Sequence, residues 1–241
     1  MKHIGKIAFF VAVFGALFVA LMLFGARLGL LEPIAGFRLY RTFFNPLAAV
    51  IAGVGVLALI IHSLRKEKSS AIAGGIVTLF GLVCLVPLIS STLNPPVRSA
   101  PINDISTDTA QPPAFEVLRA ASTGAPNSTA QSTPGLAEIQ AAAYPDIAPL
   151  ETDMSEDAAY DRALQVANDL GWEIVASDAE NRRIEAIART SVFYFADDVV
   201  VVVSPQADGS RVDMRSVSRV GRSDQGVNAA RIRTFQQKFG A

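Results

Sequence analysis

The sequence predicts an α+β protein, in which three N-terminal transmembrane helices precede a small domain with a four-stranded antiparallel sheet flanked by an N-terminal and a C-terminal helix. Three observations predict this class. The 241 residues are 51% hydrophobic with a mean hydropathy of +0.36, which is too apolar for an ordinary soluble domain. Three long apolar runs lie within residues 1–92. Residues 150–241 show one helix-like segment, four strand-like segments and a second helix-like segment.

The apolar runs cover about residues 7–29, 45–64 and 70–91 and define a membrane domain at residues 1–92. Each comes close to the roughly 20 residues needed to cross a bilayer core. Five basic residues flank one side of the predicted spans and three flank the other. They are Lys2, Lys6, Arg65, Lys66 and Lys68 against Arg27, Arg38 and Arg41. This balance predicts a cytoplasmic N-terminus and a C-terminal domain outside the cytoplasm.

Charge is unevenly distributed along the chain. Residues 1–91 carry 8 basic and 2 acidic side chains, whereas residues 92–241 carry 13 basic and 20 acidic ones. The acidic second half argues against nucleic acid as a partner. It also has no histidine and no cysteine, which excludes Ser-His-Asp triads, Cys-His pairs and the usual zinc sites there. We predict no cofactor and no metal.

A Pro/Ser/Ala-rich connecting segment follows at residues 93–149, and its prolines predict extended or turn-rich chain. Ile102, Ile105 and Phe115 are more apolar than a free linker needs, so parts of the segment are expected to lie across the folded domain.

The domain at residues 150–241 begins with an amphipathic helix at residues 155–170, for which Ser155 is a good N-cap. Strands are predicted at residues 172–178, 181–190, 197–205 and 210–219. A final helix is predicted to start near Ser223 or Asp224. The five valines at residues 199–203 indicate a strand that is covered on both faces, and the Pro-rich segment, the membrane surface or a partner are the candidates for the second cover.

Asp197 and Asp198 form a candidate carboxylate pair. Neighbours on a strand point to opposite faces, so the two cannot act together as an acid/base dyad. A divalent metal would need further oxygen ligands, for which Asp224 is the one obvious candidate. The structural alternative, which we favour, is a strand-entry pair that forms salt bridges to Arg215 or Arg219.

The stretch RSVSRVGRSDQGVNAARIR at residues 215–233 is a candidate anion site. A helix N-terminus attracts anions, and Arg219 or Arg222 beside it is suited to a phosphate or carboxylate. If Asp224 caps this helix, however, it already occupies the place of the anion. The structural alternative is arginine–carboxylate bonding at the strand–helix corner, with Arg231 and Arg233 on a solvated helix face. The candidate binding residues are Arg215, Ser216, Ser218, Arg219, Gly221, Arg222, Ser223, Asp224, Asn228 and Arg231.

These residues also carry a family resemblance. SVFYFADDVVVVV followed by RVDMRSVSRVGRSDQGVNAARIR resembles the signature of the domain of unknown function 1499 family, in which an F-x-D-D-V strand precedes an R-S-x-S-R-x-G-x-S-D-x-G-x-N-x-x-R run. The resemblance covers about residues 94–240. It implies a fold and a membrane-anchored bacterial setting, but no activity. Asn103 stands where histidine is expected in similar sequences, which further weakens any histidine-based mechanism.

We therefore expect a multi-pass protein of the bacterial inner membrane with a periplasmic or extracytoplasmic domain. The domain is expected to act as an envelope binding or interaction module, not as an enzyme. Its expected partners are the lipid bilayer and an anionic lipid or small-molecule ligand. Two alternatives remain open: an Asp-dependent hydrolase or lyase that uses a divalent metal, and a subunit of a larger complex held by a membrane protein partner.

Overall fold

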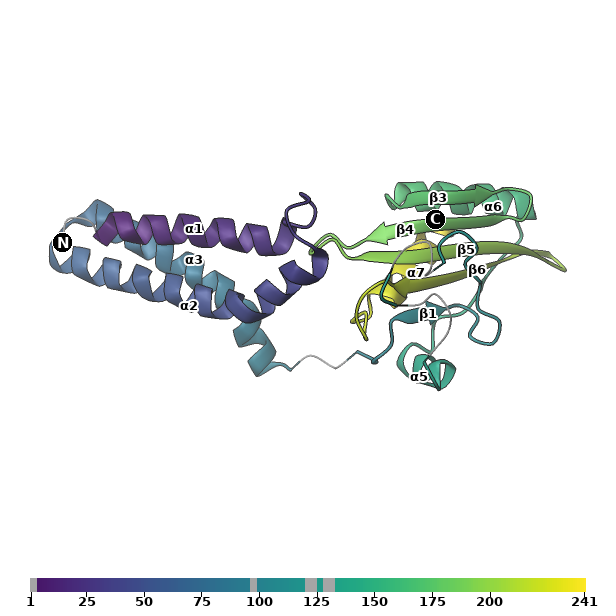
Figure 1. Cartoon of the computed structure of the whole chain (residues 1–241), viewed down its shortest axis with the longest axis horizontal. Coiled ribbons are helices and arrows are strands. Elements are labelled where there is room, and N and C mark those ends of the chain that lie inside the picture. Colours follow the sequence, from purple (N-terminus) through teal and green to yellow (C-terminus); the bar gives the residue numbers. More distant parts are fainter. Residues whose placement is uncertain (1–3, 96–98, 120–124, 128–132) are drawn as a thin grey trace. The chain divides into compact units, whose positions relative to one another are not determined.

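The computed structural model describes residues 4–95, 99–119, 125–127 and 133–241. The chain divides into two compact units (Figure 1). One comprises residues 1–97 together with Ser191–Tyr194, and the other comprises residues 98–190 and 195–241. The predicted α+β class is confirmed, with three long apolar helices first and a domain of antiparallel strands and helices after them.

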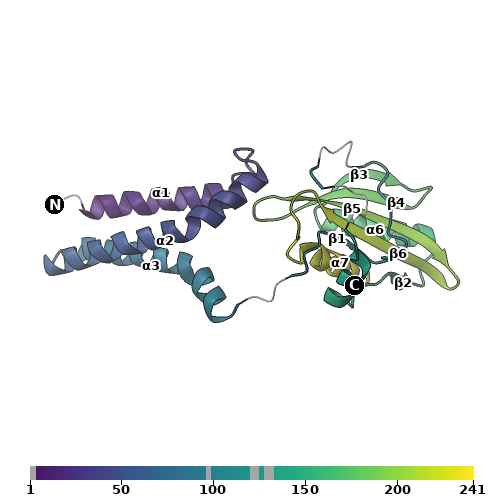
Figure 2. The ribbon, with the colours of Figure 1, turned by 60° about the horizontal axis from the view of Figure 1, so that its bottom comes forward.

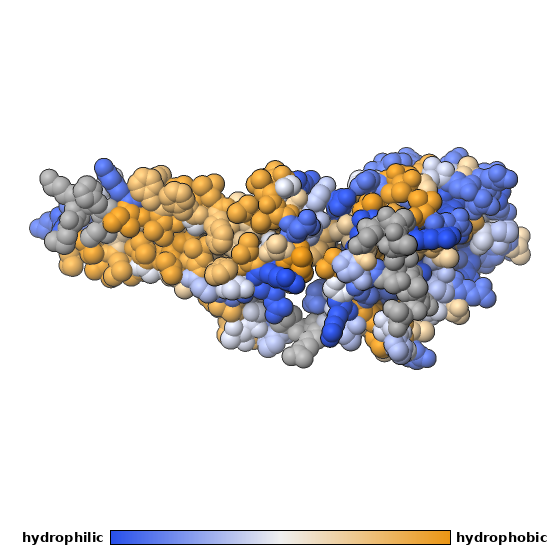
Figure 3. All heavy atoms as spheres, viewed as in Figure 1, coloured by the Kyte–Doolittle hydropathy of each residue, from blue (hydrophilic) through white to orange (hydrophobic). Residues whose placement is uncertain are grey.

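The three N-terminal helices are α1 (Ile4–Phe24), α2 (Pro33–Leu64) and α3 (Lys68–Leu93). Each is long and apolar enough to cross a membrane. Figure 3 shows hydrophobic residues gathered over these helices, as is typical of surfaces that face lipid. The second helix begins well before the apolar run at residue 45. Proline is favourable in the first turn of a helix, where Pro33 lies. The arginines that follow lower the local hydropathy, but arginine is a good helix former.

Glycines bring α2 and α3 into close contact. A Cβ added at Gly81 would lie 2.4 Å from the backbone nitrogen of Ala52, and one at Gly55 would lie 2.4 Å from that of Thr78. Small residues at these positions let two backbones approach closely, which is how many membrane helices pack. On α1, a Cβ added at Gly15 would lie 2.5 Å from the side-chain Cδ1 of Ile51 of α2, so this glycine makes room for a side chain.

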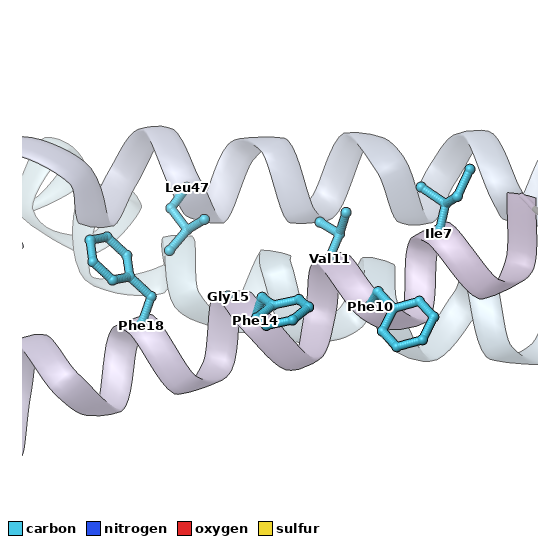
Figure 4. Close-up of a pocket in the computed structure, with 7 residues that line it drawn as sticks. All are labelled: Ile7, Phe10, Val11, Phe14, Gly15, Phe18 and Leu47. Atoms are coloured by element: carbon cyan, nitrogen blue, oxygen red, sulfur yellow. The ribbon is translucent and has the colours of Figure 1, made fainter.

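A shallow groove of about 480 Å³ runs along α1 beside α2 (Figure 4). Its lining is apolar and is formed by Ile7, Phe10, Val11, Phe14, Gly15, Phe18 and Leu47. Such a surface offers nothing to hold a polar ligand and is compatible with contact to acyl chains.

The domain contains a six-stranded sheet, not the four strands that the sequence predicts (Figure 2). The strands are β1 (Asp104–Ser106), β2 (Leu150–Thr152), β3 (Glu173–Asp178), β4 (Arg183–Arg189), β5 (Ala196–Gln206) and β6 (Gly209–Ser218). Their order is β1-β6-β5-β4-β3, β2 also pairs with β6, and all pairs are antiparallel. The two extra strands have three residues each, too few to show an alternating pattern in the sequence.

Helices cover one face of the sheet. Helix α6 (Glu156–Asp169) and helix α7 (Val227–Phe239) pack on the main core, and the short helix α5 (Leu136–Ala143) adds Leu136 to it. Ser155 caps α6 as predicted, because its hydroxyl accepts a hydrogen bond from the amide of Ala158 (3.4 Å). Helix α7 starts later than predicted, since the chain first makes a turn at Gly226 with a positive φ of 83°.

The second face of the valine strand is covered by the connecting segment. Phe115 and Leu118 pack on Val200 of β5, Ile187 of β4 and Val217 of β6. The fully buried side chain of Glu185 holds this cover in place, as it accepts hydrogen bonds from the backbone amides of residues 116, 117 and 118 at 2.5, 3.0 and 2.7 Å. The sequence left three candidates for the cover of this face, and in this structure the Pro-rich connecting segment covers it.

Candidate functional site

Asp197 and Asp198 stand on opposite faces of β5, and each has its own arginine. Nη2 of Arg231 donates to Oδ2 of Asp197 (2.6 Å), on the face that carries α7. On the other face, Nη2 of Arg219 lies 2.7 Å from Oδ1 of Asp198. Both carboxylates are almost fully buried, at 3% and 1% exposure. The two acids therefore form two separate ion pairs.

A buried polar network links β6 to α7 on the helix-covered face. The Asn228 side chain, which has no solvent exposure, accepts from the hydroxyl of Ser216 (2.7 Å) and donates to that of Ser218 (3.0 Å). It also donates to the carbonyl of Asn103 (3.1 Å). Nη1 of Arg231 donates to the Ser216 hydroxyl (2.9 Å). The structural alternative placed Arg231 on a solvated helix face, but its side chain is 9% exposed and is bonded to Asp197 and Ser216.

Asp224 fills the N-terminal end of α7. Its two oxygens accept from the amides of Gly226 (2.9 Å) and Asn228 (2.7 Å). Burial raises the pKa of Asp224, although these two hydrogen bonds act in the opposite direction. A carboxylate thus sits where an external anion would bind.

Arg215 is buried and ties β1 to β6. Nε and Nη2 donate to the two oxygens of Asp104, at 2.9 and 2.7 Å. Nη1 donates to the carbonyl of Pro113 (3.3 Å), and the guanidinium lies 5.4 Å from the centre of the Phe115 ring. This arginine therefore clamps the connecting segment to the sheet.

The loop after β6 is anchored by residues far away in the sequence. Gly221, at a φ of 99°, offers its carbonyl to the side-chain amides of Asn103 (2.7 Å) and Asn127 (2.8 Å). The hydroxyl of Ser223 donates to the carbonyl of Ala100 (2.9 Å). The corner of the fold at residues 219–224 is thus the point to which the start of the domain is fastened.

Three side chains at this corner have polar atoms that are unpartnered or exposed. Oδ2 of Asp198 is buried and has no hydrogen-bond partner, and burial raises the pKa of this carboxyl despite the nearby Arg219. The Arg219 side chain is 19% exposed. Arg222 is exposed, and in the part of the chain that the structure describes it makes no hydrogen bond or ion pair. Asp198, Arg219 and Arg222 are hereafter the open corner.

The described residues contain no group of three or more His, Cys, Asp or Glu side chains with the geometry to hold a metal ion. Asp197 and Asp198 are committed to arginines and Asp224 to backbone amides. Their arrangement supplies no open set of oxygen ligands.

Sequence reasoning missed three polar groups of this region: Asp104, Asn127 and Glu185. The first two lie in low-complexity chain, where nothing marks a residue that pairs about a hundred positions away. Glu185 had a visible signal, because it interrupts the apolar run of a strand (Ile184–Ile187) that is buried on both faces. A charge in such a place needs partners.

A family model described as "Protein of unknown function (DUF1499)" matches residues 104–239, more than half of the chain. The chain belongs to the DUF1499 family. The match begins at Asp104, the partner of Arg215, and ends on α7. It therefore spans the sheet, its cover and the corner, so the DUF1499 unit is the domain and excludes the three helices. No curated protein matches the chain.

Proposed function

We propose that this DUF1499 protein is a membrane-tethered binding module. Its open corner would capture a small ligand or lipid head group that carries both an anionic group and a hydrogen-bond donor. The observation that carries the proposal is the unpartnered Oδ2 of Asp198. Buried polar atoms in folded proteins nearly always have a partner. A ligand N–H or O–H would supply one once the side chains around Oδ2 move aside, because Asp198 is 1% exposed.

The positive charges near Oδ2 of Asp198 suit the anionic group of the proposed ligand. Arg219 already neutralises Asp198 through Oδ1, and its side chain is 19% exposed. Arg222 lies three residues further along the same loop and adds a second cation. Arginine recognises phosphate and carboxylate by paired hydrogen bonds, so the open corner combines an acceptor with two cationic donors.

We also infer that the protein is a multi-pass component of the bacterial inner membrane, with its DUF1499 domain on the extracytoplasmic side. Three membrane-compatible helices support this, since an odd number of crossings puts the N-terminus and the domain on opposite sides. The five-against-three distribution of basic residues sets the direction. An inactive phosphatase fusion after Asn94, together with a fluorescent protein fusion that glows, would contradict it.

Native mass spectrometry of the full chain in detergent tests the binding function, with spectra before and after denaturation. We expect a co-purifying mass that disappears on denaturation. Arg222→Gln is the informative variant, because this exposed side chain supports nothing in the fold. It should lower ligand occupancy about fivefold or more, as expected for the loss of one charge-assisted hydrogen bond.

Lys238→Gln is the matched control, since it removes one exposed positive charge from the last turn of α7. Arg219→Ala alone is a poor test, because it leaves the Asp198 carboxylate buried without a counter-charge. A domain that carries no ligand, or an equal loss of ligand in Lys238→Gln, would remove the basis for this function.

The hydrolase alternative finds no support in the arrangement of the acids. Asp197 and Asp198 lie on opposite faces of β5 and each pairs with an arginine, and Asp224 accepts from two backbone amides, so the three acids do not face one common site. Thermal unfolding of the full chain with and without Mg²⁺, Mn²⁺ or Ca²⁺ distinguishes the two functions: a binding module without a metal site shows no shift, and a metal-dependent enzyme is stabilised.

A further inference from the structure

The membrane unit contains a second incomplete polar site, at the end of the bundle where α1 begins, α2 ends and α3 begins. A cleft of about 660 Å³ lies there. Its lining includes Gly5 and Lys6 of α1, His62 of α2, and Ser69 and Ser70 of α3. This end also carries Arg65, Lys66 and Lys68, which the distribution of basic residues predicts on the cytoplasmic side.

His62 is the buried polar side chain of the cleft lining. It is 3% exposed, and its Nδ1 lies 2.5 Å from Oε2 of Glu67. The other ring nitrogen, Nε2, is buried and has no hydrogen-bond partner among the described residues. It points at Gly5, where an added Cβ would lie only 3.3 Å away. The missing side chain of Gly5 thus leaves space beside an unsatisfied imidazole nitrogen.

The N-terminus of α3 is uncapped. Glu67 stands at the N-cap position but makes no capping hydrogen bond, because its carboxylate is directed to His62. The first turn contains no acidic residue. Within the described chain, the first bond into the helix runs from the amide of Ala71 to the carbonyl of Glu67. The amides of residues 68–70 are therefore left to bind something else, at the positive end of the helix dipole.

The charge and the surface of the cleft define its occupant. Lys6 is exposed and forms no ion pair with any described residue, while the one carboxylate of the cleft, that of Glu67, is engaged by His62. On the adjoining turn of α1, Phe9 and Phe10 are 60% and 55% exposed. Cationic and amide donors beside an exposed apolar surface suit a phosphate that is attached to acyl chains.

We propose that this cleft binds the phosphate of an anionic membrane phospholipid. The amides and hydroxyls of Ser69 and Ser70 and the ammonium group of Lys6 hold the phosphate. Nε2 of His62 lies at the floor of the cleft and takes part in the same hydrogen bonding. Phe9 and Phe10 contact the acyl chains. This site is separate from the open corner of the domain and does not depend on the function proposed for it.

The test is lipid titration of the full chain in detergent, followed by native mass spectrometry, with phosphatidylglycerol and phosphatidylcholine as probes. We expect the wild-type protein to retain phosphatidylglycerol at least about fivefold better, the ratio that corresponds to about 1 kcal/mol for one lysine at an anionic lipid. Lys6→Gln should remove most of this preference.

Ser69→Pro is the second variant, because proline is tolerated in the first turn of a helix but lacks the amide donor. It should lower retention of both lipids, since each carries a phosphate. Lys68→Gln is the matched control: it removes the same charge at the same end of the bundle from a side chain that does not line the cleft, and it should retain lipid like the wild type.

Three outcomes would overturn the proposal. The first is equal retention of the two lipids by the wild-type protein. The second is the same loss in Lys68→Gln as in Lys6→Gln, which indicates general attraction between charges. The third is displacement of the lipid by millimolar inorganic phosphate with direct binding of that ion, which indicates a site for soluble phosphate.

Discussion

The ion pair between Arg215 and Asp104 gives the sharpest prediction about the domain. Both side chains are buried, at 4% and 7% exposure, and two hydrogen bonds join them. Asp104→Ala removes the counter-charge of the buried guanidinium and the acceptor of two of its hydrogen bonds, while the Pro113 carbonyl and the Phe115 ring stay beside it. Removal of one partner of a buried pair costs about 3–5 kcal/mol, a large share of the roughly 5–15 kcal/mol that stabilises a domain.

The measurement is urea unfolding of the full chain in detergent, followed by the fluorescence of Trp172. This is the one tryptophan of the sequence, and it is buried against Phe235 with a centroid distance of 5.6 Å, so the signal reports on the domain alone. With a slope of about 2 kcal/mol per molar urea, a loss of about 4 kcal/mol moves the unfolding midpoint down by about 2 M.

Two further variants make the test specific. Asp146→Ala removes the partner of Arg233 in a pair whose side chains are 38% and 54% exposed, and it should move the urea midpoint much less, because solvent screens an exposed ion pair. Asp104→Leu combined with Arg215→Met replaces the buried pair by apolar groups and should recover most of the stability. If Asp104→Ala costs no more than Asp146→Ala, the buried pair does not fasten the connecting segment and the reasoning is refuted.

Three other predictions follow from the structure. Glu185→Leu removes the acceptor of three backbone amides and should lower the free energy of unfolding by about 3 kcal/mol or more. Limited proteolysis should then cut the variant at residues 115–118, and a digestion pattern like that of the wild type would contradict this. Gly81→Val should lower the thermal unfolding temperature of the full chain, because its Cβ would lie 2.4 Å from the Ala52 backbone, whereas Gly53→Val, with nothing within 4 Å, should not. Burial raises the pKa of the Asp198 carboxyl, so the folded state binds its proton more tightly than the unfolded state, and the free energy of unfolding should fall as the pH rises from about 4 through the raised pKa. Asp198→Asn has no such proton, so its urea midpoint should fall less over this pH range. A difference in urea midpoint between wild type and variant that stays constant with pH would argue against this.

Local patterns in the sequence were enough to predict the main elements of the fold. A run of about 20 apolar residues indicates a membrane helix whatever surrounds it, and a period of two indicates which side chains share a strand face. The placement of Asp197 and Asp198 on opposite faces follows from that period alone. The Ser155 cap is equally local, since donor and acceptor lie three residues apart.

The short strands and the partners of the arginines could not be predicted in this way. β1 and β2 form because they pair with β6 along its edge, and three residues are too few to show an alternating pattern of apolar and polar side chains. Arg215 finds a partner 111 positions earlier in the chain, and Arg231 finds one 34 positions earlier. The sequence contains several acids at comparable separations, and only the register of the sheet decides which one comes within 3 Å.

The same distinction applies to the candidate site. By itself the sequence determined that Arg215–Asn228 forms a polar strand–helix corner, because glycine, serine and aspartate at that spacing specify a turn and a cap. Only the tertiary structure decided that most of these side chains face inward, and that Asp198, Arg219 and Arg222 remain incomplete. Whether a polar group is satisfied depends on atoms brought to it from distant segments, and that information is present only once the chain has folded.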